Sequence, residues 1–275
     1  MYNLFMNNGT YADAGYRKWQ HPASRAVFVL IHGLGAHAGR WEAAAEFFLA
    51  RGISSYAVEF NRYAPLTGPR PGSGYFDRFT NAVLGLRAIA LKENPGKRIF
   101  LIGESMGALL SFLLATRQSG LFRGLVCISP AFASRVRLSP ADYLKIILFF
   151  PFDPEHRIRL PFNSSMCTRD AGYRARLDAD PREKRMAPVG LLVDVMLAQA
   201  RAGRQARALK ESVLFAVAGK DQLVVSQASQ DLFRKLEVAD KTLIEYPDMY
   251  HALSIDTDKE RVFEDIVGWA EKRIS

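Results

Sequence analysis

The pentapeptide GESMG, residues 103–107, places one serine between two glycines. The apolar run KRIFLI precedes it, and ALLSFLLATR, which has helical spacing, follows it. Glycines leave room for a sharp turn from strand to helix, which exposes the serine hydroxyl and leaves the next backbone N–H free to bind an anion. The pattern predicts that Ser105 is a catalytic nucleophile; the alternative interpretation is a tight structural turn.

A serine hydroxyl is a weak nucleophile and needs a histidine base and an acid that orients the histidine. Two histidines follow Ser105 in the chain. His156 lies in the irregular stretch FDPEHRIR, where a solvated role is expected. His251 follows the last predicted strand, in TLIEYPDMYHALS, where a loop at the sheet edge can reach back over the serine. We therefore expect His251 to be the base.

Two aspartates compete for the role of the acid. Asp221 comes directly after the predicted strand SVLFAVAG, and Asp248 precedes His251 by three residues. Because the acid must hold the imidazole on the side away from the serine, closeness in sequence is no advantage. The sequence favours Asp221 and leaves Asp248 as a turn residue.

The segment HGLG, residues 32–35, follows the apolar run AVFVLI. With a serine turn of this kind, a loop in this place supplies one backbone N–H of an oxyanion hole, and the residue after the serine supplies the other. The predicted donors are therefore Leu34 and Met106. His32 is interpreted as a structural residue that holds the loop.

Short apolar runs alternate with segments of helical spacing along most of the chain, which predicts an α/β fold with a mostly parallel sheet covered by helices on both faces. An antiparallel hairpin with its turn at Asn8-Gly9 is expected at the N-terminal end. Residues 61–74 are predicted to form a loop. The alternation stops between residues 131 and 210, where prolines and arginines gather. We expect a core of residues 1–130 and 211–275 with a cap inserted at 131–210.

Four motifs together, HGLGAHAGRWE, GESMGA, GKDQLV and YPDMYHAL, resemble the monoacylglycerol lipase, lysophospholipase and serine-aminopeptidase-like branch of the α/β-hydrolases. The likeness covers roughly residues 5–274. It implies an acyl ester or lipid substrate, a catalytic triad of Ser105, Asp221 and His251, and neither cofactor nor metal. One motif departs from the family: EFNRYAPLTGPRPG stands where such proteins commonly carry an Asp-x-Arg-Gly-His-Gly-x-Ser loop.

Three alternatives stay open at this point. The first is a dinucleotide-binding protein, because Gly33 to Ala38 fits G-x-G-x-x-A after a strand and Glu59 ends the next strand. The second is an aminopeptidase of the same fold. The third is a module that binds a ligand without catalysis.

The 275 residues carry a net charge of +9, yet no zinc-finger spacing or RNP-like motif accompanies it, so a nucleic-acid partner is not expected. The N-terminus lacks the pattern of a signal peptide, and Cys127 and Cys167 are too few for a disulfide framework. We expect a cytoplasmic protein.

The stretch YLKIILFF, residues 143–150, is apolar nearly all round, with arginines nearby in the sequence. A fully buried helix would explain it without any function. The alternative prediction is a mobile cap in which Ile147 and Phe150 line an acyl tunnel and contact a membrane or micelle surface.

Overall fold

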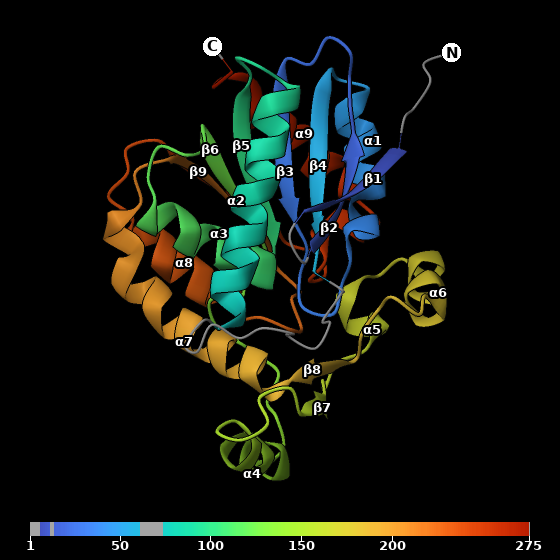
Figure 1. Cartoon of the computed structure of the whole chain (residues 1–275), viewed down its shortest axis with the longest axis vertical. Coiled ribbons are helices and arrows are strands. Elements are labelled where there is room, and N and C mark those ends of the chain that lie inside the picture. The colour runs from blue at the N-terminus through green and yellow to red at the C-terminus, as the bar shows by residue number, and fades with distance from the viewer. Residues whose placement is uncertain (1–5, 12–13, 61–73, 275) are drawn as a thin grey trace.

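The computed structural model describes residues 6–11, 14–60 and 74–274, with side chains from residue 15 onward. Within these ranges one eight-stranded sheet runs in the order β1-β2-β4-β3-β5-β6-β9-β10 (Figure 1). The pairs β1/β2 and β2/β4 are antiparallel and the other pairs are parallel, which confirms the predicted mostly parallel sheet. Its strands are β1 (Met6–Tyr11), β2 (Ala14–Trp19), β3 (Ala26–Ile31), β4 (Ile53–Glu59), β5 (Arg98–Glu104), β6 (Gly124–Ile128), β9 (Ser212–Ala218) and β10 (Lys241–Tyr246).

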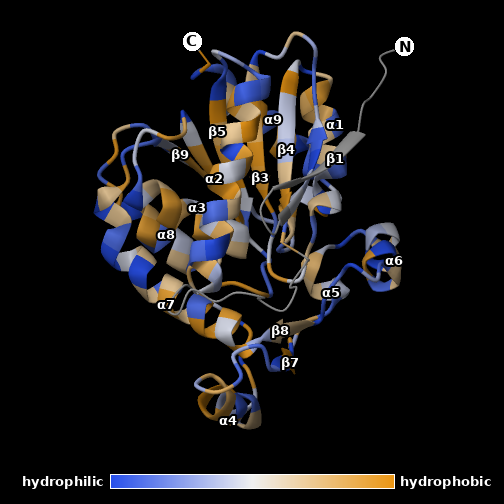
Figure 2. Cartoon of the chain, in the orientation of Figure 1, coloured by the Kyte–Doolittle hydropathy of each residue, from blue (hydrophilic) through white to orange (hydrophobic). Residues whose placement is uncertain are grey.

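Helices cover both faces of the sheet. Alternate residues of a strand point to opposite faces, and in the central strands both sets of residues are apolar and need to be covered. In β3, Val27 and Val29 belong to the core under one layer of helices, whereas Phe28 and Leu30 belong to the core under the other. Apolar residues therefore run continuously along the central strands, as the orange β3 and β5 show in Figure 2. The first layer contains α2 (Tyr75–Glu93), α3 (Met106–Arg117) and α8 (Ser226–Lys235), and the second contains α1 (Glu42–Leu49) and α9 (Lys259–Glu271).

The predicted N-terminal hairpin is present, but the prediction of its turn was wrong. Asn8 lies opposite Arg17 and Gly9 opposite Tyr16, in the middle of the β1–β2 pair. The connection falls at residues 12–13, outside the described residues. A turn at Asn8-Gly9 would leave most of β2 without its β1 partner, whereas the observed register pairs all six residues of each strand. The predicted loop over residues 61–74 also lies outside the described residues, apart from Gly74.

The chain between β6 and β9 leaves the sheet at the carboxyl ends of the parallel strands (Figure 1). It forms α4 (Pro140–Phe149), β7 (Arg157–Arg159), α5 (Ser164–Cys167), α6 (Ala171–Ala179), β8 (Met186–Pro188) and α7 (Val189–Gln205). A small apolar cluster holds part of it together: Ile146, Ile158, Leu160, Ala187, Val189 and Leu192.

Helix α7 ties this inserted chain to the rest of the molecule. Its residues Leu191, Ala198 and Ala202 belong to the main core, in which α7 packs against α2 and α3. The insertion therefore shares its core with the sheet and its helices. The boundaries at residues 131 and 210 remain a prediction. Among the described residues, none of the helices combines the length and the apolar character needed to cross a lipid bilayer.

Candidate active site

Ser105 occupies the sharp turn between β5 and α3. Its backbone has φ 58° and ψ −119°, a left-handed conformation that is costly for a residue with a side chain. Three hydrogen bonds hold this conformation: the Ser105 N–H donates to Ile128 O at 2.9 Å, and Ser105 O accepts the N–H groups of Leu109 at 3.1 Å and of Ala131 at 3.2 Å. Strained backbone of this kind persists where the surrounding structure determines it, and it concentrates at functional sites.

The two glycines beside Ser105 are required by close approach of the backbone. A Cβ atom at Gly103 would lie 2.4 Å from the carbonyl oxygen of Gly107, and one at Gly107 would lie 2.3 Å from Ile31 O. Both distances are far below van der Waals contact. The turn therefore packs directly against the end of β3, where the HGLG loop begins.

His251 lies in the loop after β10, and its Nδ1 is 2.8 Å from Oδ2 of Asp221. Both residues are buried. The other carboxylate oxygen, Oδ1, accepts backbone N–H groups from Leu223 and Val224, each at 2.8 Å. Because Oδ2 can only accept, Nδ1 carries the proton, and Nε2 is left as the basic nitrogen.

The electrostatic surroundings set the basicity of His251. Burial by itself would lower the pKa of the imidazole, but the charge of Asp221 and its hydrogen bond outweigh burial, so the pKa lies above its usual range. A buried imidazolium next to a buried carboxylate is thus stabilised. This arrangement suits a group that takes up a proton during a reaction.

The rival residues lie elsewhere. The side chain of Asp248 is 70% exposed and pairs with Lys220 at 2.8 Å. His156 stacks on Phe149, with ring centroids 3.7 Å apart, and lies in the insertion away from the cavity described below. Of the two candidate acids, only Asp221 contacts His251 in the described structure.

The HGLG loop lies directly beside the serine turn. A Cβ atom at Gly33 would approach Cβ of Ser105 to 3.1 Å. His32 holds this loop: its Nδ1 pairs with Gly33 O at 2.8 Å, and its Nε2 accepts the N–H of Phe60 at 3.1 Å. Burial lowers the pKa of His32 to about 4, so the ring is neutral and both of its nitrogens are engaged. Met106 is the first residue of α3, so its backbone N–H has no acceptor within the helix.

These contacts also explain the glycine pattern that resembled a dinucleotide-binding fingerprint. Gly33 makes room for Ser105, while Gly35, at φ +78°, lies against the insertion, where a Cβ atom would come within 2.3 Å of Lys184 O. Contacts within the chain therefore require Gly35 and favour Gly33, so the dinucleotide-binding interpretation loses its basis.

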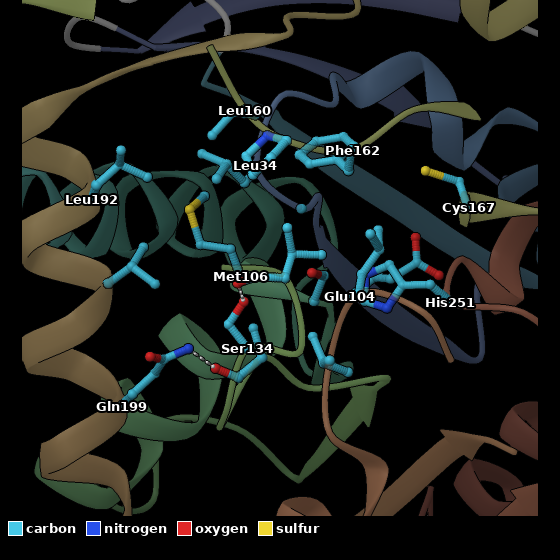
Figure 3. A pocket seen from close by; sticks show the side chains of 18 of the residues that line it. Leu34, Glu104, Met106, Ser134, Leu160, Phe162, Cys167, Leu192, Gln199 and His251 are labelled. Atoms are coloured by element: carbon cyan, nitrogen blue, oxygen red, sulfur yellow. Dashed lines mark hydrogen bonds between the residues drawn. The ribbon is translucent and has the colours of Figure 1, made fainter. Parts of the chain in front are cut away.

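Ser105 and His251 line one cavity together with Leu34 and Met106. Figure 3 labels His251, Leu34 and Met106 around this cavity. Its volume is about 190 Å³, whereas a single water needs only about 10–15 Å³. Most of the other side chains around it are apolar and come largely from the insertion: Val136, Leu138, Tyr143, Leu160, Phe162, Leu192, Val195, Met196, Leu223 and Val224.

Ile147 and Phe150 are not part of this lining, so the prediction that they line the tunnel was wrong for both. Their side chains are 70% and 42% exposed, and of the residues in α4 only Ile146 is buried. The interpretation of α4 as a fully buried helix is also wrong. The helix projects from the sheet, and Tyr143 is the residue of α4 that reaches the cavity.

Two charged residues at the cavity were missed by the sequence reasoning. Glu104, directly before the serine, accepts the N–H and Oγ–H of Ser254 at 3.1 and 2.9 Å, and burial raises the pKa of its carboxyl group. Arg40, from the segment HAGRWE, is paired with Glu183. The place of Glu104 inside the serine motif was a usable signal, but nothing local marked Arg40.

Comparison with known proteins places these features in a family. Residues 22–258 match the family model described as serine aminopeptidase, S33. The chain is 27% identical over 275 residues to the human monoglyceride lipase, covering 95% of this chain and 89% of that protein. It is 25% identical over 246 residues to the monoacylglycerol lipase of Mycolicibacterium smegmatis, covering 89% and 88%.

Solved structures agree with this placement. The monoacylglycerol lipase of Paleococcus ferrophilus superimposes with a TM-score of 0.79 at 25% identity, covering 92% of this chain and 96% of that chain. A soluble variant of the Saccharomyces cerevisiae monoglyceride lipase, with a substrate analog bound, has a TM-score of 0.82 at 21% identity, covering 99% and 96%, and shares the fold. The chain therefore belongs to the serine aminopeptidase S33 family of α/β-hydrolases, and its likeness to the monoacylglycerol lipase branch of that fold is confirmed.

Proposed function

We propose that this chain is a serine ester hydrolase of the monoacylglycerol lipase type, with Ser105 as nucleophile, His251 as base and Asp221 as the acid that orients the base. One observation carries the proposal. Ser105, on its strained turn, and His251, held by Asp221 at 2.8 Å, open onto the same largely apolar cavity. An apolar cavity with a few polar groups at one place suits an acyl chain whose carbonyl carbon lies beside the nucleophile.

In the proposed reaction Ser105 Oγ attacks the ester carbonyl while Nε2 of His251 takes its proton. The backbone N–H groups of Leu34 and Met106 stabilise the resulting oxyanion. The protonated imidazole then gives its proton to the leaving alcohol, and the acyl group remains on Ser105. Water, deprotonated by His251, attacks the carbonyl of this acyl-enzyme; the bond from the acyl carbon to Ser105 Oγ then breaks, His251 returns the proton to Oγ, and the fatty acid is released. The carboxylate of Asp221 holds the imidazole through Nδ1 and stabilises the imidazolium.

The choice of an ester over a peptide rests on the charges at the cavity. An aminopeptidase must bind the free amine of its substrate, which calls for a carboxylate that faces the substrate. Glu104 is the acidic residue among the described lining residues, and its carboxylate is engaged with Ser254. An ester with an apolar acyl group therefore matches the cavity better than a peptide with a charged N-terminus.

The nucleophile is tested with a fluorophosphonate probe and a series of monoacylglycerol and p-nitrophenyl esters. We expect labelling at Ser105 and a loss of at least about 10⁴-fold in ester hydrolysis in Ser105→Ala, since the members of such a triad act as a unit. Aminoacyl amides serve as the comparison substrates. Labelling at another residue, or preferred hydrolysis of the amides, would contradict the proposal.

We also propose that α4 contacts a lipid or micelle surface. Helix α4 lies at the end of the molecule away from the sheet (Figure 1), and large apolar side chains of this helix and of the turn that follows are exposed. Residues 131–210 hold 15 Lys and Arg against 8 Asp and Glu, so this segment contributes +7 of the net charge of +9. Apolar groups among cations fit an anionic lipid surface. The apolar surface consists of Tyr143, Leu144, Ile147, Leu148, Phe150 and Phe152.

A further inference from the structure

Residues 160–185 of the insertion, which include α5 and α6, form a segment that we call the arm. The arm contacts two separate loops at the carboxyl edge of the sheet. One is the loop of residues 32–41 after β3, which carries Leu34. The other is the loop of residues 247–256 after β10, which carries His251. The arm thereby connects the two loops that the proposed reaction depends on.

A buried ion pair joins the arm to the first loop. Arg40 Nε donates to Oε1 of Glu183 at 2.7 Å, and Nη2 donates to the other oxygen. The two side chains are 13% and 6% exposed. Two parallel hydrogen bonds between a guanidinium and a carboxylate define orientation as well as distance. Beside this pair, the backbone N–H of Lys184 donates to Gly35 O at 2.8 Å, one residue from Leu34.

His37 adds a third contact between the arm and the same loop. Its Nδ1 accepts the N–H of Gly39 at 3.0 Å, so the proton of the neutral ring lies on Nε2. Nε2 is 3.2 Å from Oδ2 of Asp180. The arm and the loop also touch without a gap, because a Cβ atom at Gly35 would meet Lys184 O at 2.3 Å.

The second loop is joined to the arm through Asp256, whose carboxylate is fully buried. Three donors from the arm bind this carboxylate. Thr168 Oγ1 and the backbone N–H of Arg169 donate to Oδ1 at 3.0 and 2.7 Å, and Nε of Arg169 donates to Oδ2 at 3.0 Å. Oδ2 also accepts the N–H of Tyr250, the residue before His251, at 2.8 Å.

The residue after His251 is bonded to the arm directly. The N–H of Ala252 donates to Cys167 O at 2.9 Å. Both chain neighbours of His251 are therefore held, one by the arm itself and the other by the carboxylate that the arm surrounds. Apolar contacts in one small cluster support this junction: Cys167, Leu177, Ala252 and Ile255.

We propose that the arm is a fixed brace that sets the positions of the Leu34 N–H and the His251 ring, and that Glu183 and Arg169 are its positioning residues. This inference rests on the proposed function, because it assigns the brace to those two groups. Neither positioning residue is among those that line the cavity.

The expected effect follows from the sensitivity of an oxyanion hole to position. One donor is worth about 10²–10³ in kcat, and a displacement of about 1 Å can cost about 10². Glu183→Gln leaves the guanidinium of Arg40 buried without its charged partner, so the loop must move or admit water. Arg169→Gln removes the charged donor from the arm to Oδ2 of Asp256 and leaves the two donors to Oδ1, Thr168 Oγ1 and Arg169 N, in place. Each change weakens one end of the brace.

The experiment measures kcat and KM on p-nitrophenyl butyrate, per active site titrated with a fluorophosphonate. We expect kcat to fall by about 10-fold or more in Glu183→Gln and in Arg169→Gln, with KM changed by less than about 3-fold, because the altered interactions act in the transition state. Asp178→Asn and Arg207→Gln are the matched controls. They remove the same charges from an ion pair inside the arm and from an exposed surface pair.

Backbone hydrogen exchange provides a readout that needs no catalysis. Exchange should accelerate at residues 34–38 in Glu183→Gln and at residues 249–252 in Arg169→Gln, but not in the controls. The brace would be overturned if Glu183→Gln and Arg169→Gln both kept the wild-type rates of hydrogen exchange and the kcat of their matched controls. Should Glu183→Gln fail to fold, Arg169→Gln tests the other end by itself. A wild-type protein that hydrolyses no ester would instead overturn the proposed function, while the exchange experiment still decides the brace.

Discussion

The replacement of Asp221 by asparagine tests the site most sharply, because the surroundings dictate how the new amide must turn. Oδ1 of Asp221 accepts two backbone N–H groups, from Leu223 and Val224. The carbonyl oxygen of asparagine will take that place, which leaves its NH2 group facing Nδ1 of His251. Nδ1 must then accept a hydrogen bond, so the ring proton moves to Nε2 and the nitrogen that should take the proton of Ser105 is blocked.

The expected loss in kcat is about 10⁴-fold, the size associated with the wrong tautomer in serine hydrolases, or about 5.4 kcal/mol in activation free energy. Asp248→Asn is the matched control, because it makes the same change three residues from His251 at an exposed side chain paired with Lys220. We expect it to keep activity within about 2-fold, as for a weak surface ion pair. The assay is steady-state ester hydrolysis, normalised to folded protein by circular dichroism.

The same variant has a pH signature. The pKa of His251 is raised above its usual 6.5, since Asp221 outweighs the effect of burial. The charged pair therefore stabilises the fold fully below about pH 6.5, and its contribution is lost as the pH rises through the raised pKa. Asp221→Asn should cost more unfolding free energy at about pH 6 than at about pH 9, as measured by urea denaturation. A loss in Asp248→Asn as large as that in Asp221→Asn, or an equal stability cost at both pH values, would refute this reasoning.

Three further predictions follow from the geometry. In a pH–rate profile, ester hydrolysis should decline as the pH is lowered, with a midpoint above about 6.5, since His251 must be neutral to act as a base. A midpoint near 4 would point to His32 instead. Gly103→Ala should lower the unfolding free energy by about 1–3 kcal/mol or more through its backbone clash, while Gly268→Ala, where a Cβ atom meets nothing within 4 Å, should leave it equal or higher in thermal melts. Serines at both Ile147 and Phe150 should depress hydrolysis of long-chain esters in anionic vesicles far more than that of acetate esters. Equal losses on the two substrates would contradict a lipid-binding role of α4.

Much of the fold was accessible from the sequence because its signals are local. A run of alternately packed apolar residues such as AVFVLI predicts a strand that is buried on both faces, and β3 is such a strand. The glycines around Ser105 predicted a sharp turn, since the residue types of a few neighbours determine whether the backbone can adopt such a turn. The sequence favours Asp221 as the acid because it directly follows a strand, and parallel strands end at one edge of the sheet.

Other features were decided by competition between distant segments. Asn8-Gly9 has the local preference of a turn, yet pairing along the whole of β2 outweighs it. The apolar residues of α4 are compatible with a core helix and with an exposed one, because the hydrophobic periodicity of a helix does not determine what packs against it. The side chains of Ile147 and Phe150 are exposed since nothing in the described structure covers that side of α4.

The sequence by itself determined the α/β alternation, the serine turn and the order in which the candidate catalytic residues occur, because strand and turn preferences depend on residues close together in the chain. Only the tertiary structure decided the 2.8 Å contact between Asp221 and His251, the place of Glu104 at the cavity, and the pairing of Arg40 with Glu183 across 143 positions. Such contacts depend on where whole loops come to rest. The residues next to a charged side chain in the sequence do not indicate which distant partner will neutralise it once both are buried.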